Sequence, residues 1–244
     1  MEILKYVLYA VLALLGLGLA YVLTVVVASF FVDMEKPLEK QSRFFRKAVD
    51  ILIPFFVWVC GERPVIEGME KMPEGKFLMV CNHRSMFDPL TVMARFQKYN
   101  IAYISKPENM KIPVVGPGTY ATGSLAIDRE NNREALKTII RAAEQIKSGL
   151  CNMMIYPEGT RSRSGELLDF HAGSFKIAQR AGCDLVICAI DGSENVTKRL
   201  FRPTKVVLSV LETLPADKVK SMSTEALAEY SKNLIATHLA SRSH

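Results

Sequence analysis

The feature that most constrains this chain is an uncharged run of 27 residues, Tyr6–Val32, made mostly of Leu, Val and Ala. As an α-helix it rises about 1.5 Å per residue, long enough to cross a hydrocarbon slab of roughly 30 Å with some tilt. The run greatly exceeds the apolar core of a secretory signal, and Ser29-Phe30-Phe31 offers no small-x-small cleavage site. The sequence therefore predicts a membrane-anchored protein with a globular remainder.

Basic residues flank this run unequally. Only Lys5 precedes it, whereas five follow within fifteen positions: Lys36, Lys40, Arg43, Arg46 and Lys47. Because cytoplasmic loops carry an excess of Lys and Arg, we expect the remainder to lie on the cytoplasmic side of the cell membrane. The five cysteines are odd in number and form no CxxC pair, so they suggest neither a disulfide framework nor a zinc knuckle.

A second apolar stretch, Ala48–Cys60, is too short to span a bilayer and follows the basic segment 36–47. We expect Pro37 to open a helix here. The basic beginning and aromatic end predict an amphipathic segment that lies in the interface, with Trp58 near the headgroups. The alternative is a core helix of the globular part, interrupted at Pro54.

The first interpretation divides the chain into an anchor, residues 1–60 (apolar helix 6–32 and interfacial segment 37–60), and a globular domain, residues 61–244. The predicted strands of the domain are Val65–Met69, Phe77–Cys81, Ile101–Ser105, Ser124–Asp128, Asn152–Tyr156, Leu185–Ile190 and Lys205–Leu211. The predicted helices are Pro89–Gln97, Asn131–Lys147, Gly173–Ala181 and Thr224–Ser241. Since most strands are continuous apolar runs, we expect an α/β fold, with a mixed, mostly parallel sheet of about seven strands flanked by helices.

The formal net charge of +6 divides into +1 for residues 1–60 (6 basic, 5 acidic) and +5 for the rest (25 basic, 20 acidic). This modest surplus fits an anionic lipid surface or a phosphorylated substrate. Nucleic-acid binding would call for a dense Lys and Arg stripe with interleaved aromatic residues, and the sequence has none. We therefore expect no nucleic-acid partner.

A first set of polar residues, Cys81–Pro89, lies where a predicted strand ends and a helix begins, a place where α/β proteins put their chemistry. A turn there can bring Asp88 back onto one imidazole nitrogen of His83. The carboxylate would then fix the tautomer and leave the other nitrogen as a general base for a substrate hydroxyl. Alternatively, Asp88 before Pro89 is an ordinary helix N-cap and His83 is a structural histidine.

A second set, Tyr156–Gly165, directly follows another apolar strand. Its turn at Gly159 can present backbone N–H groups, and Thr160 offers a hydroxyl. Arg161 supplies a guanidinium fork that matches phosphate oxygens. The sequence therefore predicts an anion site here, with a solvated basic turn as the alternative.

With both sets in place, the chain resembles the 1-acylglycerol-3-phosphate acyltransferase (lysophosphatidate acyltransferase) family of HxxxxD glycerolipid acyltransferases. The first motif reads NHRSMFDP and the third YPEGTRS, in the family's order and roughly seventy residues apart. The second motif matches Gly123–Arg129, and the apolar fourth block matches Leu185–Ile190. The resemblance covers about residues 61–211.

The resemblance implies a role for each matching residue. His83 would be the base that activates the acceptor hydroxyl, and Asp88 would orient it. The acceptor phosphate would be bound by Lys106, Arg129, Glu158, Gly159, Thr160 and Arg161. Lys106, which follows a predicted strand, is equally well explained as a surface lysine.

The implied reaction transfers an acyl chain from an acyl thioester, on coenzyme A or acyl carrier protein, to the free sn-2 hydroxyl of 1-acylglycerol-3-phosphate. The product is phosphatidate for phospholipid biosynthesis. We expect direct transfer with no acyl-enzyme and no cofactor. We expect no metal either, because the HxxxxD pair lacks the further ligands of a catalytic zinc site. Anchoring at the bilayer would give lysophosphatidate and other membrane lipids a lateral path to the site.

Two features depart from the family pattern. Tyr156 stands where Phe is more usual, and the fourth block reads Val-Ile-Cys-Ala-Ile, which we interpret as a packing strand. Other functions remain open. The acceptor could be glycerol-3-phosphate, another lysophospholipid or a lyso-aminolipid. The protein could also be a lipid esterase with Cys81 or Ser85 as nucleophile, although no GxSxG elbow is present, or a catalytically silent membrane scaffold.

Overall fold

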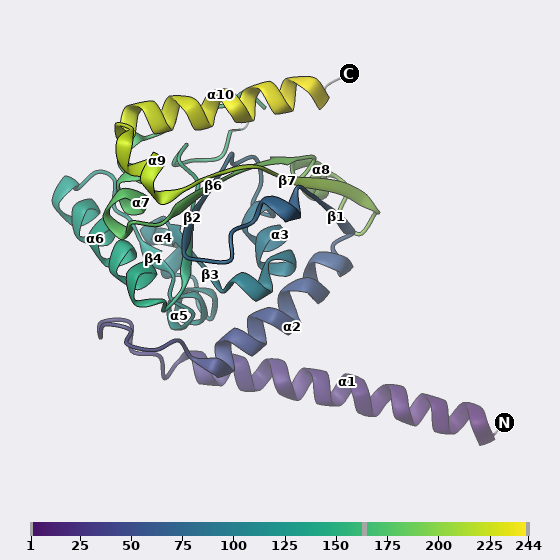
Figure 1. Cartoon of the computed structure of the whole chain (residues 1–244). Helices are drawn as coiled ribbons and strands as arrows, with labels where there is room; N and C mark the ends of the chain where they lie inside the picture. Colours follow the sequence, from purple (N-terminus) through teal and green to yellow (C-terminus); the bar gives the residue numbers. More distant parts are fainter. Residues whose placement is uncertain (1, 163–164, 243–244) are drawn as a thin grey trace.

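A mixed seven-stranded sheet forms the centre of the protein, with helices on both faces (Figure 1). The computed structural model describes residues 2–162 and 165–242. The strands are β1 (Glu62–Glu67), β2 (Phe77–Cys81), β3 (Ile101–Ser105), β4 (Leu125–Ala126), β5 (Asn152–Ile155), β6 (Asp184–Asp191) and β7 (Thr204–Leu214). The helices are α1 (Glu2–Ser29), α2 (Arg43–Val59), α3 (Asp88–Arg95), α4 (Pro107–Met110), α5 (Val115–Ala121), α6 (Asn132–Ser148), α7 (Lys176–Ala181), α8 (Glu194–Lys198), α9 (Ala216–Ser221) and α10 (Thr224–Arg242), with 3-10 turns η1 (Met69–Lys71), η2 (Gln97–Tyr99) and η3 (Ala172–Phe175). The predicted α/β fold is confirmed.

The strand order is β1-β7-β6-β2-β5-β3-β4. Every neighbouring pair is parallel except β6 and β7. The carboxyl ends of β2, β3, β5 and β6 therefore lie along one edge of the sheet, where polar loops can meet. Each predicted strand is present, but β1 begins at Glu62 rather than Val65, and β4 is shorter than predicted.

The central strand β2 shows why the sheet is buried on both faces. Leu78 and Val80 point into a core formed with α6, α7 and α10. Phe77 and Met79 point to the opposite face, into a core formed with α3. All four side chains are fully buried. A continuous apolar run is therefore required here, as the sequence indicated.

Helix α6 forms where its capping residues predict. The side chain of Asn131 accepts the backbone N–H groups of Arg133 and Glu134, each at 3.2 Å. Gly149 ends the helix with φ of 74°, in the left-handed region that suits glycine. These local signals position the helix that follows the second motif of the sequence.

The start of α2 differs from the prediction. The helix begins at Arg43 and not near Pro37, because Ser42 caps it: its Oγ accepts the backbone N–H of Phe45 at 3.4 Å. The helix also continues through Pro54 without interruption.

Helix α2, which contains most of the second apolar stretch, has features of both an interfacial segment and a core helix. One side packs against α3, α5 and β1, and the other is exposed. The packed side chains are Phe45, Ala48 and Val57. The exposed side chains include Ile51, Phe55 and Trp58. This helix therefore packs on the domain and also exposes an apolar face.

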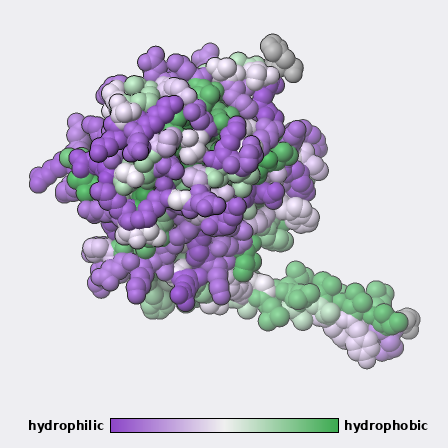
Figure 2. Space-filling view, in the orientation of Figure 1, coloured by the Kyte–Doolittle hydropathy of each residue, from purple (hydrophilic) through white to green (hydrophobic). Residues whose placement is uncertain are grey.

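Helix α1 has the length and composition to cross a membrane. Its last turns contact the domain, where Val25 and Ser29 are buried. Figure 2 shows the rest as an apolar rod that projects from a largely hydrophilic surface. The helix suggests membrane association.

Candidate active site

The first loop of the site is fixed to the sheet by Asn82, the residue after β2. Its side-chain nitrogen donates to the carbonyl of Ile190 at 2.9 Å, and its oxygen accepts the Ile190 N–H at 2.8 Å. Ile190 lies in β6, the strand beside β2. Asn82 is buried, so these bonds satisfy its polar atoms and define where the loop begins.

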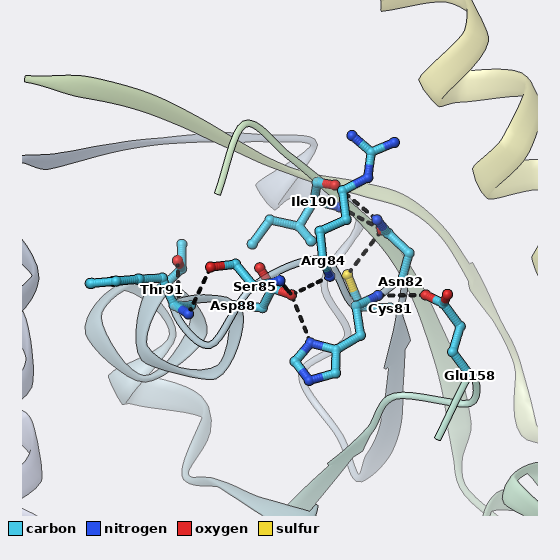
Figure 3. Close-up of polar contacts among 10 residues, drawn as sticks. Cys81, Asn82, Arg84, Ser85, Asp88, Thr91, Glu158 and Ile190 are labelled. Carbon is cyan, nitrogen blue, oxygen red and sulfur yellow. Dashed lines mark hydrogen bonds and ion pairs between the residues drawn. The ribbon is translucent and has the colours of Figure 1, made fainter. Parts of the chain in front are cut away.

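His83 and Asp88 meet as the sequence predicts. Nδ1 of His83 lies 2.7 Å from Oδ2 of Asp88 (Figure 3). The same oxygen accepts the backbone N–H groups of Arg84 at 2.7 Å and Ser85 at 2.9 Å, and Asp88 is fully buried. When a carboxylate holds the protonated Nδ1, Nε2 is left as the acceptor, and this is the arrangement that a general base requires.

The N-cap interpretation of Asp88 is wrong. Asp88 is the first residue of α3, and its side chain binds amides that precede the helix. Phe87 occupies the cap position and makes no side-chain cap bond. The carboxylate therefore serves the loop and the imidazole rather than the helix terminus.

Glu158 joins the second loop to the first. One carboxylate oxygen accepts the backbone N–H of His83 at 2.6 Å, and the other accepts the N–H of Leu168 at 3.0 Å. The N–H of Ser162 returns a bond to the carbonyl of His83 at 2.9 Å. Glu158 is buried, and burial raises the pKa of its carboxyl, while the two backbone amides favour the charged form. The two sequence motifs are thus locked around the backbone of His83.

Tyr156, the last residue before this second loop, packs on the catalytic candidate. Its ring stacks on the imidazole of His83 with centroids 4.2 Å apart and an interplanar angle of 18°. Burial raises the pKa of its hydroxyl well above the usual value. The stacked ring limits the rotation of His83 and helps hold Nδ1 toward Asp88.

Arg129, from the loop before α6, reaches the same place. Its Nη2 donates to the carbonyl of Tyr156 at 3.3 Å. Its Nη1 is buried and has no hydrogen-bond partner among the described residues. The guanidinium lies directly over Gly159, where an added Cβ would come within 1.7 Å of Nη1. Gly159 also has φ of 71°, so both contact and conformation call for glycine.

Burial lowers the pKa of Arg129, but an arginine keeps its charge near neutral pH. The result is a partly buried cation whose Nη1 has no hydrogen-bond partner among the described residues. It lies over a turn in which the Gly159 N–H already donates to the carbonyl of Tyr156 at 3.1 Å. Such a donor is suited to an anion.

The other predicted phosphate-site residues are more peripheral. Thr160 and Arg161 follow Gly159 and are exposed. Lys106 is exposed at the carboxyl end of β3 and precedes α4. The structure therefore brings His83, Asp88, Arg129, Glu158 and Gly159 into direct contact and leaves these three side chains exposed at the edge. Arg163 and Ser164, in the same loop, lie outside the described residues.

Two residues near the site are not identified by sequence reasoning. Arg84 donates to Asp191 at 2.8 Å and to the carbonyl of Gly165 at 3.2 Å, so it ties both loops to the end of β6. His171 lies beside Arg129 and Gly159, and burial together with the Arg129 charge lowers its pKa. Neither pairing has a local signal, because each joins residues far apart in the chain.

The alternative nucleophiles are poorly placed for chemistry. Cys81 is fully buried in the sheet, and burial raises the pKa of its thiol well above the usual value. Ser85 is buried as well, and its Oγ accepts the backbone N–H of Phe87 at 3.2 Å. Among the described residues no group of three or more His, Cys, Asp or Glu side chains could hold a metal ion.

A buried carboxyl lies behind the pair. Glu62, at the start of β1, is 1% exposed and accepts a hydrogen bond from Thr91 Oγ1 at 2.5 Å. Burial raises its pKa to about 7, and the charge of Asp88 acts in the same direction. The folded protein therefore keeps a proton that the unfolded chain loses near its ordinary pKa of 4.5.

Stability should consequently depend on pH through Glu62. The free energy of unfolding should fall as pH rises from 4.5 to about 7, by about 1.4 kcal/mol per unit or ~3 kcal/mol in total. Glu62→Gln keeps the acceptor for Thr91 and removes this dependence. Chemical unfolding in detergent at several pH values tests it, with exposed Glu70→Gln as the control. Identical pH dependence in the Glu62 variant and the unaltered protein would contradict the assignment.

The model of the acyltransferase family matches residues 63–191, more than half of the chain, and the protein belongs to this family. The chain is 27% identical over 167 residues to a 1-acyl-sn-glycerol-3-phosphate acyltransferase of Salmonella typhimurium, covering 68% of each chain. It is 26% identical over 194 residues to one of Chlamydomonas reinhardtii, covering 75% of this chain but 56% of the relative.

The fold is similar to the crystal structure of the 1-acyl-sn-glycerophosphate (LPA) acyltransferase PlsC from Thermotoga maritima. The TM-score is 0.68 at 25% identity, and the match covers 91% of this chain and 88% of that one. The resemblance drawn from the sequence motifs is therefore confirmed at the level of family and fold.

Proposed function

We propose that the protein acylates the free sn-2 hydroxyl of 1-acylglycerol-3-phosphate with an acyl thioester, giving phosphatidate in phospholipid biosynthesis. The names of its relatives support this acceptor. The observation that carries the proposal is the contact between two sites. His83 has its Nδ1 on Asp88 and its backbone bound to Glu158 of the second loop. In that loop Gly159 lies under Nη1 of Arg129, which has no hydrogen-bond partner in the described part of the chain. A general base held close to a donor for anions suits a substrate that carries both a hydroxyl and a phosphate.

In the proposed mechanism, Nε2 of His83 accepts the proton of the acceptor hydroxyl as its oxygen attacks the thioester carbonyl. The imidazolium formed is stabilised by the carboxylate of Asp88. The oxyanion then collapses, the carbon–sulfur bond breaks, and the proton on Nε2 passes to the leaving thiolate. The base is regenerated, and no acyl-enzyme forms.

The phosphate would be held by Arg129 and the exposed side chains of Thr160, Arg161 and Lys106. Gly159 would contribute by leaving room for the Arg129 guanidinium, because its own N–H donates to the carbonyl of Tyr156. Glu158 is assigned a positioning role instead. Its two oxygens already accept backbone N–H groups, and a carboxylate repels a phosphate. It would act by keeping the base and the phosphate loop in register.

We further propose that residues 1–60 anchor the enzyme in the cell membrane and that residues 61–244 act from the cytoplasmic side. Coenzyme A or acyl carrier protein would deliver the acyl chain. The apolar α1 and the exposed apolar side of α2 support the anchor. The basic residues after α1 support the orientation.

An acceptor panel tests the proposal. Purified protein is given one acyl thioester and, separately, lysophosphatidate, glycerol-3-phosphate, another lysophospholipid and a lyso-aminolipid. Fastest acylation of lysophosphatidate is expected. Preference for another acceptor would support acyl transfer but contradict lysophosphatidate as the acceptor. Release of free fatty acid with every acceptor would indicate an esterase.

Cys81→Ala should remain active, because the buried thiol takes no part in direct transfer. Its transfer rate should stay within a few-fold of that of the unaltered protein, allowing for a small loss of packing. Mass spectrometry during turnover should find no acyl adduct. A stoichiometric, hydroxylamine-sensitive adduct on Cys81 or Ser85 would place the protein in the covalent class.

A further inference from the structure

The turn between α8 and β7, residues 199–202, presents apolar side chains in an unusual conformation. Leu200 is 44% exposed and Phe201 is 68% exposed. Phe201 has φ of 65°, in the left-handed region that bulky residues rarely adopt. Such strain persists only where the surroundings impose it, and it is frequent at functional positions. The conformation of this turn is therefore imposed by its surroundings.

The surroundings that impose it belong to the end of α2. The backbone N–H of Phe201 donates to the carbonyl of Cys60 at 3.0 Å, and that of Thr204 donates to the carbonyl of Gly61 at 2.8 Å. Gly61 is pressed against the backbone of Arg202, where an added Cβ would lie 2.3 Å from the carbonyl oxygen. In Figure 1 the turn lies next to the end of α2, on the side of the domain toward which α1 projects.

The turn and the end of α2 therefore form one surface. Phe55 is 63% exposed and Trp58 is 60% exposed, close in the chain to the Cys60 carbonyl that holds Phe201. The guanidinium of Arg63 lies 5.5 Å from the centre of the Trp58 ring. Aromatic and aliphatic groups are thus interleaved with a cation, as in segments that lie at a membrane surface.

The charge around this surface is positive. Arg63, Lys198, Arg199 and Arg202 are all exposed. Among the described residues none of the four has a salt bridge to an acidic side chain. Glu194 and Asp191, nearby in the chain, are paired with Arg84. An apolar tip flanked by these arginines matches a bilayer with anionic headgroups.

We propose that the 199–202 turn is a membrane contact of the domain. Leu200 and Phe201 enter the boundary between headgroups and acyl chains, and Arg199 and Arg202 bind lipid phosphates. The contact lies outside the N-terminal anchor and would fix the tilt of the domain on the bilayer. It goes beyond the proposed function, and its test needs no turnover.

Fluorescence quenching in full-length protein provides that test. Trp58 is the only tryptophan, so Trp58→Phe gives a silent background. Leu200→Trp is then compared with Leu136→Trp on α6, whose leucine is 43% exposed and therefore equally accessible. Both variants are placed in vesicles of phosphatidylcholine and phosphatidylglycerol with acyl chains brominated or not.

In either kind of vesicle the indole at position 200 should emit further to the blue than the indole at position 136. Brominated lipid should quench the indole at position 200 and leave that at position 136 nearly unchanged. Adding Arg199→Glu and Arg202→Glu should reduce the quenching in these anionic vesicles. Equal quenching at the two positions would overturn the proposal. So would a blue shift without quenching that grows with protein density, since that would indicate contact between copies of the chain.

A further variant separates membrane contact from a structural role. Phe201→Gly relieves the left-handed backbone and removes the exposed ring. The variant should unfold at the same or a higher temperature and still lose lipid quenching at position 200. A lower unfolding temperature with quenching unchanged would mean that the ring supports the fold instead.

Discussion

His83→Ala is expected to lower acyl transfer about 10²–10⁴-fold while the fold stays intact, because the acceptor hydroxyl loses its base. The imidazole is mostly buried, with 18% of the side chain exposed, and stacks on Tyr156, so its removal leaves a gap there. Asp88 keeps the N–H groups of Arg84 and Ser85 as partners, which should preserve the loop. Transfer from an acyl thioester to lysophosphatidate measures the loss, and the unfolding temperature checks the fold. Near-normal turnover by folded His83→Ala would show that His83 is not the base.

Asp88→Asn should have a smaller effect on transfer. An asparagine oxygen can still accept from the imidazole and the backbone N–H groups of Arg84 and Ser85, but it does not stabilise the imidazolium with a charge. The variant therefore separates orientation from electrostatic stabilisation. Loss greater than that of His83→Ala would show that the carboxylate mainly holds the loop.

The second large effect is expected at the phosphate. A guanidinium can meet a phosphomonoester with paired charge-assisted hydrogen bonds of about 1.5–3 kcal/mol each. Loss of one such bond corresponds to about 10- to 150-fold. Arg161→Lys and Arg129→Ala should weaken transfer to lysophosphatidate by such factors, because lysine lacks the fork and alanine lacks the charge.

An uncharged monoacylglycerol serves as the control acceptor. Its slow background rate should barely change in either variant, because it has no phosphate for the arginines to hold. Arg161 is exposed, so its replacement carries little risk to the fold. If both acceptors slow by the same factor, the arginines support the structure or bind the thioester, and the phosphate assignment is wrong.

Much of the fold could be predicted because its signals are local. The run Phe77–Cys81 is apolar at every position, and all five of its side chains are buried. Asn131 and Gly149 mark the ends of α6 by backbone chemistry that needs no distant partner. The start of α2 was less predictable, since Pro37 and Ser42 are both acceptable openings and the structure uses Ser42, whose hydroxyl caps the helix.

The two motifs of the site could be predicted from the sequence, but the contacts that join them could not. His83 and Asp88 meet within a single turn, so their spacing carries the geometry. The bonds from Glu158 to the backbone of His83 and from Asn82 to Ile190 join residues 75 and 108 positions apart. They depend on β2 lying between β5 and β6, an order that no local pattern encodes.

The most direct test of the account follows the acyl group through one turnover. The purified protein is mixed with lysophosphatidate and a thioester labelled in its acyl chain, and the label is traced to phosphatidate, free fatty acid or protein. The label is expected to move to phosphatidate without residence on the protein, and His83→Ala should block this transfer. Label recovered mainly as fatty acid, or bound to the protein before product appears, would contradict direct transfer by His83.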